Sequence, residues 1–336
     1  YNMKNSKKII ALTISMLCSF IIFAQPTFEW ARTMGGSDND FSQSIATDVN
    51  GNIYTTGSFS DTVDFDPNAD TLLLSAPGST SIFIQKLDAN GNLVWAGAMG
   101  GTYAEGTSIY VDDSGYVYTT GNFLGTMDFD LDSSIYNLTS GGNQDIFIQK
   151  LDSTGKLIWA KKVGASWYDF GLSIVVDQAG SVYTTGTFNS TVDFDPGSGT
   201  HYLYTPSNFD EDVFILKLDA NGDFLWAKDF GHTGDEYCED IALDVNGNVY
   251  IAGGFSGILD FDPNPLVTNN KISNGGADIF VLKLDSLGNF SWVQTMGGTG
   301  YDYGLSIAVD SFGNVLTLGN YEGHVDFNPN MGIDTF

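Results

Sequence analysis

Five tryptophans recur at a nearly constant spacing, and this period constrains the fold more than any other feature of the chain. They are Trp30, Trp95, Trp159, Trp226 and Trp292, which lie 65, 64, 67 and 66 residues apart. Each opens a variant of one phrase, which includes S-I-A-x-D-x-x-G-N-x-Y-x-T-G-x-F, V-D-F-D-P and D-I-F-I-Q-K-L-D-x-x-G-N. A unit copied at a fixed period is one supersecondary element that packs against its neighbours. The repeat therefore decides the fold class before any single residue does.

Four segments of each repeat unit have the composition of β-strands. In the first unit they are residues 44–48, 52–59, 81–88 and 92–98. None shows the 3.6-residue spacing of an amphipathic helix, and several are apolar on both faces, as in sheets that pack between other sheets. Glycine accounts for 40 of the 336 residues, and aromatic residues are plentiful. Glycine turns between aromatic and β-branched strands predict an all-β fold.

The segments that join these strands predict hairpin turns. Asp48 to Asn52 joins the first two strands, and Asp88 to Asn92 joins the last two. In such a turn the Asp side chain caps the backbone and Gly takes the position with positive φ. An EF-hand calcium loop is the alternative, but Ile53 stands where that loop needs Gly and Phe59 where it needs the bidentate Glu. The turn recurs at Asp112 to Gly115, Asp152 to Gly155, Asp177 to Gly180, Asp219 to Gly222, Asp244 to Asn248, Asp285 to Asn289 and Asp310 to Asn314.

A four-stranded antiparallel unit that repeats around an axis is a blade of a β-propeller. From Trp30 to Phe327 the chain resembles the SBBP-type repeat proteins, secreted bacterial polypeptides with seven-bladed β-propellers. The resemblance rests on G-G-x-x-x-D-x-G-x-S-I-A-x-D-x-x-G-N-x-Y-x-T-G and D-I-F-I-Q-K-L-D-x-x-G-N-x-x-W. It implies that the strand at 44–48 is innermost, that the tryptophan strand is outermost, and that residues 28–34 are an outer strand with no blade before them.

We therefore expect an all-β propeller with four complete blades and one partial blade. The fifth unit supplies only two inner strands, at 305–310 and 314–321. This predicts an incomplete or open ring, and a five-bladed closure would lack its third strand. Residues 25–336 would form the propeller repeats, truncated at the C-terminus. The resemblance also implies a sorting or adhesion module further downstream.

Residues 1–24 have the pattern of a secretory signal peptide, beginning two residues upstream of Met3. Three lysines precede an apolar run that ends at Phe23, and Ala24 offers a small residue for cleavage. No later segment is long and apolar enough to cross a membrane. We expect the protein to be secreted or displayed on the cell surface. Cys238 is then the only cysteine of the mature chain, which excludes an intrachain disulfide.

The formal net charge of -28 excludes the basic footprint of a nucleic-acid-binding protein. Strong acidity attracts cations or basic partners. An acidic residue follows each of the five tryptophans by ten positions; these residues are Asp40, Glu105, Asp169, Glu236 and Asp302. They fall in the loops between blades, which lead into the innermost strands. We expect them to surround the mouth of the central channel.

The connection from the second to the third strand reaches the same face and is also acidic. It contains Asp64-Phe65-Asp66-Pro67 and its copies at 128–130, 193–196, 260–263 and 326–329. In an extended D-F-D segment the two carboxylates point one way and Phe the other, so Phe is expected inside. The acids of both kinds of loop either cap backbone N–H groups, hold calcium through oxygen ligands, or attract a basic partner. Calcium is the cofactor that this arrangement suggests.

The sequence offers no established catalytic motif. His201, His232 and His324 are the only histidines, and none recurs in the repeat. The loop at 231–240 departs most from the pattern, because His232 and Cys238 join extra acids there, a combination suited to a transition metal. We expect an interaction or adhesion scaffold that binds a protein or glycan through its acidic loop face without catalysis. The alternative is a carbohydrate-active hydrolase or lyase that uses carboxylates on that face.

Overall fold

The computed structural model describes residues 28–327, with the exception of 133, 206–209, 232–233 and 235. The chain divides into two compact units, residues 1–31 and residues 32–336. The described residues of the first unit, 28–31, contain neither helix nor strand. The signal peptide expected at 1–24 lies outside the described residues and stays a prediction. The strands all belong to the second unit.

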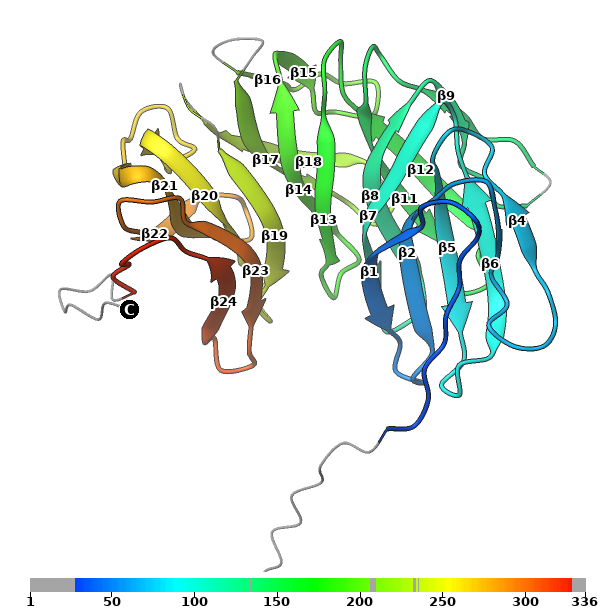
Figure 1. Ribbon diagram of the computed structural model, residues 1–336. Helices are drawn as coiled ribbons and strands as arrows, with labels where there is room; N and C mark the ends of the chain where they lie inside the picture. Colours follow the sequence, from blue (N-terminus) through cyan, green and yellow to red (C-terminus); the bar gives the residue numbers. More distant parts are fainter. Residues whose placement is uncertain (1–27, 133, 206–209, 232–233, 235, 328–336) are drawn as a thin grey trace, which may run out of the picture. The chain divides into compact units, whose positions relative to one another are not determined.

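Four sheets of the second unit each contain four antiparallel strands that follow the chain from one edge to the other (Figure 1). The strands of the first two sheets are β1 (Phe41–Thr47), β2 (Ile53–Phe59), β5 (Ser81–Leu87), β6 (Leu93–Met99), β7 (Tyr103–Val111), β8 (Val117–Leu124), β11 (Asp145–Leu151) and β12 (Leu157–Val163). Those of the next two are β13 (Phe170–Val176), β14 (Val182–Asn189), β17 (Glu211–Leu218), β18 (Phe224–Phe230), β19 (Tyr237–Leu243), β20 (Val249–Asp260), β21 (Asn270–Leu284) and β22 (Phe290–Met296). These are four propeller blades, and the all-β prediction is confirmed.

A fifth sheet contains only β23 (Tyr303–Val309) and β24 (Val315–Asn320). The innermost strands β1, β7, β13, β19 and β23 contact one another in this order, so the blades pack in chain order. Hydroxyl groups join them, because Ser44 Oγ accepts the Ile109 N–H at 3.2 Å and Ser108 Oγ accepts that of Ile174 at 3.3 Å. The expected four complete blades and one partial blade are thus found.

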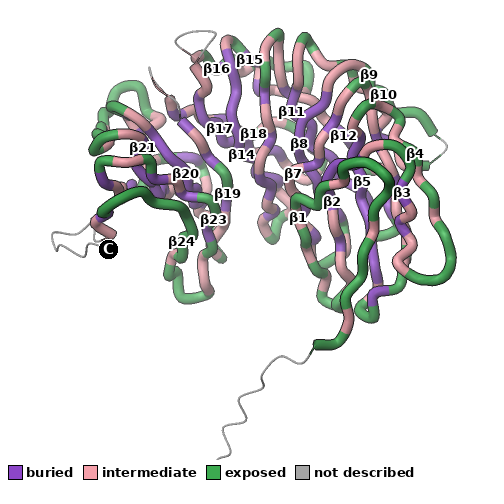
Figure 2. The backbone as a smooth tube through the Cα atoms, in the orientation of Figure 1, coloured by how far each residue is buried: buried purple, intermediate pink, exposed green. Residues whose placement is uncertain are grey.

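Strands at the two ends of this series of blades expose apolar side chains. The third strands β5 and β11 are buried along their whole length, whereas β24 is almost entirely exposed (Figure 2). Leu318 of β24 is 68% exposed and Ile45 of β1 has the same exposure. A strand pair with no third strand beside it and no further sheet over it cannot bury its apolar side chains.

The connections between second and third strands contain hairpins that were not expected. Three blades carry a separate two-stranded sheet there, and in the fourth blade β20 and β21 extend to form the same structure. The three hairpins are β3 (Thr62–Asp64) with β4 (Leu73–Ser75), β9 (Thr126–Asp128) with β10 (Asn137–Thr139), and β15 (Thr191–Asp193) with β16 (Tyr202–Tyr204). Strands of three residues are too short to show an alternating pattern in the sequence.

The Phe of each D-F-D segment anchors its hairpin in the blade core. Phe129 is fully buried, and its ring lies 5.3 Å from that of Phe123 at the end of β8 and 5.4 Å from that of Phe147 in β11. The same three-ring cluster recurs in the other three complete blades. Phe therefore points inward, as predicted. Fully burying one such ring stabilises the fold by about 1.5–3 kcal/mol.

The outer strand expected at 28–34 is not formed. These residues contain no strand, and the nearest pairing is an isolated bridge between Gly35 and Asp64. A strand needs a neighbour along its length to satisfy its backbone groups, and the described residues offer these positions no third strand of a preceding blade. Gly297 and Asp326 form the equivalent bridge at the other end of the series, so the same short pairing occurs at both ends.

Candidate functional site

The D-x-x-G-N turns fold as the sequence predicts. Asp48 Oδ1 accepts the N–H groups of Asn50 and Asn52, both at 2.9 Å, and Gly51 has a φ of 78°. The other Asp48 oxygen accepts hydrogen bonds from the Asn52 side chain at 2.7 Å and from the Tyr54 hydroxyl at 3.2 Å. The carboxylate is fully engaged inside its own turn. The capping interpretation is therefore confirmed for these turns.

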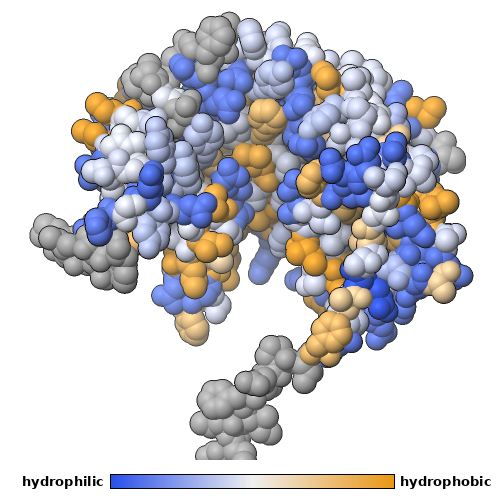
Figure 3. Space-filling model, viewed as in Figure 1, coloured by the Kyte–Doolittle hydropathy of each residue, from blue (hydrophilic) through white to orange (hydrophobic). Residues whose placement is uncertain are grey.

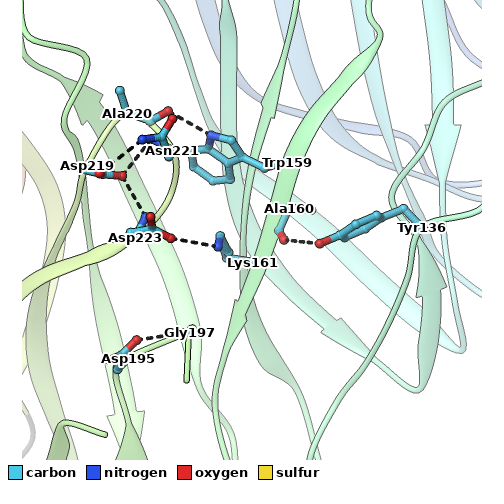
Figure 4. A network of polar contacts seen from close by, with 10 residues as sticks. All are labelled: Tyr136, Trp159, Ala160, Lys161, Asp195, Gly197, Asp219, Ala220, Asn221 and Asp223. Carbon is cyan, nitrogen blue, oxygen red and sulfur yellow. Dashed lines mark hydrogen bonds and ion pairs between the residues drawn. The ribbon is translucent and has the colours of Figure 1, made fainter. Parts of the chain in front are cut away.

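Two of the recurrent tryptophans, Trp95 and Trp159, join one blade to the next by a hydrogen bond. Trp159 Nε1 donates a 3.1 Å hydrogen bond to the Ala220 carbonyl, which lies in the β17–β18 turn of the following blade (Figure 4). Lys161 reaches Asp223 of the same turn at 3.7 Å, and Asp219 caps that turn. Trp95 makes the equivalent bond to the Ser153 carbonyl at 3.2 Å. The 65-residue period of tryptophan thus has an architectural cause.

The five acids of the inter-blade loops lie one to a joint, each within its own loop. Asp302 Oδ2 accepts the Gly298 N–H and its Oδ1 accepts the Glu322 N–H, both at 2.8 Å. Asp40 and Asp169 make the same two kinds of contact, one to a loop N–H and one to an N–H at the end of the second strand, that of Ser60 or Asn189. Glu105 differs, because its carboxylate accepts the Tyr103 hydroxyl. Asp40, Asp169 and Asp302 therefore each tie an inter-blade loop to the blade that follows.

The five acids differ in how far their side chains are exposed. Asp169, Glu236 and Asp302 are 0% exposed, while Asp40 and Glu105 are half-buried. Within the described residues, no three His, Cys, Asp or Glu side chains come together in a way that would hold a metal ion. The calcium site predicted for these five residues stays a prediction.

A second recurrent carboxylate lies beside the inter-blade acid, and this neighbour was not anticipated. Asp278 lies in β21, directly before the segment 279–284 that pairs with strands on both sides. The Asp302 N–H donates to the carbonyl of the adjacent Ala277 at 2.8 Å. Asp145 stands in the same relation to Asp169, whose N–H donates to the Gln144 carbonyl at 2.9 Å. Asp212 corresponds to them in the third blade. The three third-strand acids are 4% exposed or less.

The glycine that follows the outer strand makes room for these carboxylates in the second, third and fourth blades. A Cβ atom on Gly297 would stand 2.1 Å from Asp278 Cγ, and one on Gly231 would stand 2.0 Å from Asp212 Cγ. The next residue of the pair donates its N–H to the second acid, as Gly298 does to Asp302. In the fourth blade the Gly297-Gly298 pair thus contacts both carboxyl groups of the joint. A recurring Asp opposite a recurring Gly was the sequence signal for it.

Burial changes the acidity of these groups. It raises the pKa of Asp169 to about 7, and it raises that of Asp212 to about 8 with further contributions from the charges of Glu236, Asp229 and Asp210. Burial also raises the pKa of Asp145 and of Asp278. Such shifts arise because the charged form loses its hydration. Perturbed carboxyls mark functional sites in many enzymes, but here the groups lie inside the blade joints.

The D-F-D acids hold the hairpin loops. Asp64 Oδ1 accepts the N–H groups of Asp66 and Leu72, at 3.0 and 2.9 Å. Asp128, Asp193 and Asp260 make the same pair of contacts. The capping interpretation is confirmed for these four aspartates. The fifth copy runs into residues 328–329, which lie outside the described part of the chain.

The loop at 231–240 contains the thiol that was considered for a transition metal. Cys238 is fully buried, and burial raises the pKa of its thiol to about 12. Thr185 Oγ1 donates to Cys238 Sγ at 3.2 Å. His232 lies outside the described residues. A neutral thiol inside the core is a packing group, because metals bind the thiolate.

Two neighbouring hollows open between the innermost strands at the end of the blades that carries the D-x-x-G-N turns. Their volumes are about 590 and 660 Å³, and they share Tyr110, Val176 and Asp177. Turn residues and apolar strand residues line the first hollow, and the second is lined also by Lys150, Asp112 and Asp113. The expected acidic face lies at the opposite ends of the same strands, so these hollows are separate from it.

Comparison with known proteins agrees with the repeat architecture. The family model described as the SBBP β-propeller repeat matches residues 29–58. An uncharacterized WD repeat-containing protein, L264, of Acanthamoeba polyphaga mimivirus is 27% identical over 203 residues, which are 56% of this chain and 15% of that protein. The regulatory protein FlaEY of Caulobacter vibrioides is 28% identical over 162 residues, 47% of this chain and 16% of that protein.

The chain therefore carries a β-propeller repeat of the SBBP type, as the sequence motifs indicated. It aligns with only a small part of the length of these two relatives, 15% and 16%. Among the residues described, no helix is long and apolar enough to cross a membrane.

Proposed function

We propose that the protein is an exported interaction scaffold that binds a protein or glycan partner through the loops at one end of its blades. The proposal rests chiefly on the hairpins between second and third strands, which combine a loop held by capping and by a buried Phe with exposed apolar side chains. Export is inferred from the signal-like segment at 1–24, and the secreted or cell-surface location is part of the proposal. Catalysis is not part of it.

The loop of each hairpin is held by the capping Asp and by the buried Phe that follows it. In the third blade, Asp193 Oδ1 accepts the N–H groups of Asp195 and His201, and Phe194 is fully buried beside them. Rigid support of a surface loop is the usual arrangement at a binding site, because it limits the entropy lost when a partner binds.

The hairpins and their loops expose large apolar side chains in all four complete blades. They include Leu73 (64% exposed), Ile135 (76%), Tyr202 (50%), Tyr204 (61%) and Leu266 (92%). Tyrosine and other large apolar residues at the surface are enriched in protein interfaces, and aromatic rings also stack on sugars. Hydrophobic residues lie scattered among hydrophilic ones on the face of the second unit seen in Figure 3. The acidic residues around them favour a partner with basic or hydroxyl groups.

Antiparallel geometry places these hairpins at the same end of the blades as the inter-blade loops. Contacts agree with this, since Asp169 of a loop binds the N–H of Asn189, the last residue of β14. The surface offered to a partner is therefore built from several blades at once. A repeat protein commonly binds in this way, through loops that neighbouring units supply to one surface.

The test is a binding screen with matched variants on the two ends of the blades. The full chain is applied to a glycan array and to immobilised cell-surface proteins, together with Tyr202→Ser/Tyr204→Ser and with Val49→Ser/Val245→Ser. The two valines are 73% and 71% exposed in D-x-x-G-N turns, at the other end. Binding that the tyrosine variant loses and the valine variant keeps supports the proposal. Equal binding by both variants contradicts the assignment of the surface.

The carbohydrate-active hydrolase or lyase stays the alternative. It predicts that the glycans bound on the array are also cleaved, with new reducing ends that increase with time. A product that disappears when Glu236 is changed to Gln, in a variant that still folds, would replace the scaffold proposal with the enzyme.

A further inference from the structure

The acid pairs in the blade joints differ in one respect: only one of the described pairs has a lysine. In the second blade, Lys162 Nζ lies 2.7 Å from Asp145 Oδ2, beside Asp169. Lys162 pairs with Phe147 across the β11–β12 register. The ammonium group supplies the positive charge that two buried carboxyls need to stay ionised at moderate cost.

The equivalent position has no cation in the other blades. The residue that faces the same core Phe is Ala98 in the first blade, Asp229 in the third and Thr295 in the fourth. The first blade also lacks the third-strand acid, since Ser81 faces Gly100 there. Its single glutamate therefore needs no lysine. The third and fourth blades keep both acids but replace the lysine.

The fourth blade shows the consequence most completely, because its whole joint is described. Asp278 is 4% exposed, and its Oδ1 atom accepts no hydrogen bond from the described residues. Asp302 is 0% exposed, and each of its oxygens accepts one backbone N–H group. No Lys, Arg or His nitrogen of the described chain lies within ion-pair distance of either carboxyl. The two carboxyls belong to the same joint, because the Asp302 N–H donates to the carbonyl of Ala277, the residue before Asp278, at 2.8 Å.

We propose that the Asp278–Asp302 pair binds a divalent cation of the hard, oxygen-seeking class, with Ca²⁺ as its representative. The cation takes the place in the fourth blade that the Lys162 ammonium takes in the second. Carboxylate oxygens, backbone carbonyls and water are the ligands that Ca²⁺ accepts. With two protein carboxylates, carbonyls of the joint and water molecules complete the coordination. This site is separate from the hairpin surface, and it does not depend on the identity of the partner.

The position of the site assigns the cation a structural task. The Asp302 carboxylate already joins the inter-blade loop to the residue after β24. Asp278 belongs to the preceding blade. A cation shared by the two would therefore link the fourth blade to the partial fifth one, where the series has the least packing. Binding to the folded state alone raises stability in proportion to the logarithm of the cation concentration.

The repeat supplies matched variants for the test. Thr295→Lys introduces the lysine of the second blade, and Asp278→Ser introduces the serine of the first blade, so each mimics a joint that already folds in this chain. Lys162→Thr does the reverse and turns the second joint into a copy of the fourth. Circular dichroism and amide exchange establish that each variant folds.

The measurement is equilibrium dialysis of the EDTA-stripped full chain against radioactive Ca²⁺, with the thermal midpoint recorded in Ca²⁺ and in chelator at constant ionic strength. We expect the wild type to bind Ca²⁺ and to gain in midpoint. Thr295→Lys and Asp278→Ser lose one equivalent, or bind it about tenfold or more weakly, since affinity depends on the number of charged ligands. Lys162→Thr gains one equivalent.

Two results would overturn the inference. One is a wild-type chain that binds no Ca²⁺ and has the same midpoint in chelator, which would mean that the pair holds a proton instead. The other is a folded Thr295→Lys variant that binds as many equivalents as the wild type. Failure of either kind leaves the hairpin proposal standing, because partner binding is measured on other residues.

Discussion

Replacing Asp212 by Asn removes a buried charge whose effect on stability depends on pH. Asp212 is 2% exposed, its Oδ1 accepts no hydrogen bond from the described residues, and its pKa is raised to about 8. Burial is the largest cause, and the negative charges of Glu236, Asp229 and Asp210 add to it. Because the folded state binds this proton more tightly than the unfolded chain, the group's contribution is complete below pH ~4 and is lost as pH rises towards 8.

The size of the effect follows from the two pKa values. Between pH 5 and pH 8 the wild type loses roughly 4 kcal/mol that an uncharged Asn keeps, at ~1.4 kcal/mol for each pH unit. We therefore expect the advantage of Asp212→Asn in unfolding free energy to grow by about this amount from pH 5 to pH 9. That is a large share of the ~5–15 kcal/mol by which ordinary domains are stable.

Urea unfolding at the two pH values, in the presence of chelator, measures this difference. The control is Asp219→Asn, in the β17–β18 turn, because backbone hydrogen bonds from Asp223 and Asn221 lower the pKa of Asp219. Its linkage is opposite: the carboxylate stabilises the fold above the unfolded pKa of ~4 and loses this effect only as pH falls below it, so the deficit of the control variant should be the same at pH 5 and pH 9. If Asp212→Asn changed the unfolding free energy by the same amount at pH 5 and pH 9, the interpretation that this joint buries an acidic group would be refuted.

Three further substitutions test the blade architecture by urea unfolding or thermal melting. Phe194→Ala empties a ring position 5.0 Å from Phe214 and is expected to cost about 3–5 kcal/mol, whereas a loss below ~1 kcal/mol would contradict its place in the core. Trp159→Phe removes the bond to the Ala220 carbonyl and should cost about 1 kcal/mol, with no loss expected if the indole does not join the blades. Asp48→Ala uncaps a turn and should lower stability by about 1 kcal/mol, while Asn50→Ala, as its control, should change little.

Most of the blade was predictable because its signals are local and recur. The third strand was expected at 81–88 and is found at Ser81–Leu87, and the last pair was expected at 305–310 and 314–321. Turn chemistry fixed the ends of these strands. The inward direction of Phe129 followed from the two-residue period of a strand. These features need only neighbours in the sequence.

The joints were not predictable in the same way, because their contacts join residues from different parts of the repeat. Asp278 and Asp302 are brought together by the backbone bond from Asp302 to Ala277. Asp278 read as the first residue of a strand, and Gly297 as a turn residue. The missing lysine is visible only after the β21–β22 register places Thr295 opposite Phe280, as Lys162 is opposite Phe147.

The outer strand expected at 28–34 shows the opposite error, because there the local pattern was right and the context was missing. Trp30 begins the same phrase as the other tryptophans, yet residues 28–34 contain no strand. A strand signal predicts a capacity to pair, and pairing also requires a partner with free backbone groups. The isolated Gly35–Asp64 bridge is the part of that strand that finds one.

Backbone amide exchange, read by mass spectrometry on the full chain, tests most directly whether each repeat unit folds as a four-stranded blade. The account predicts the slowest exchange in β5, β11, β17 and residues 278–284, which have a hydrogen-bonded strand on both sides. It predicts fast exchange in β24, which pairs with β23 alone. Protection in β24 equal to that in the four third strands, or third strands that exchange as fast as the loops around them, would contradict it.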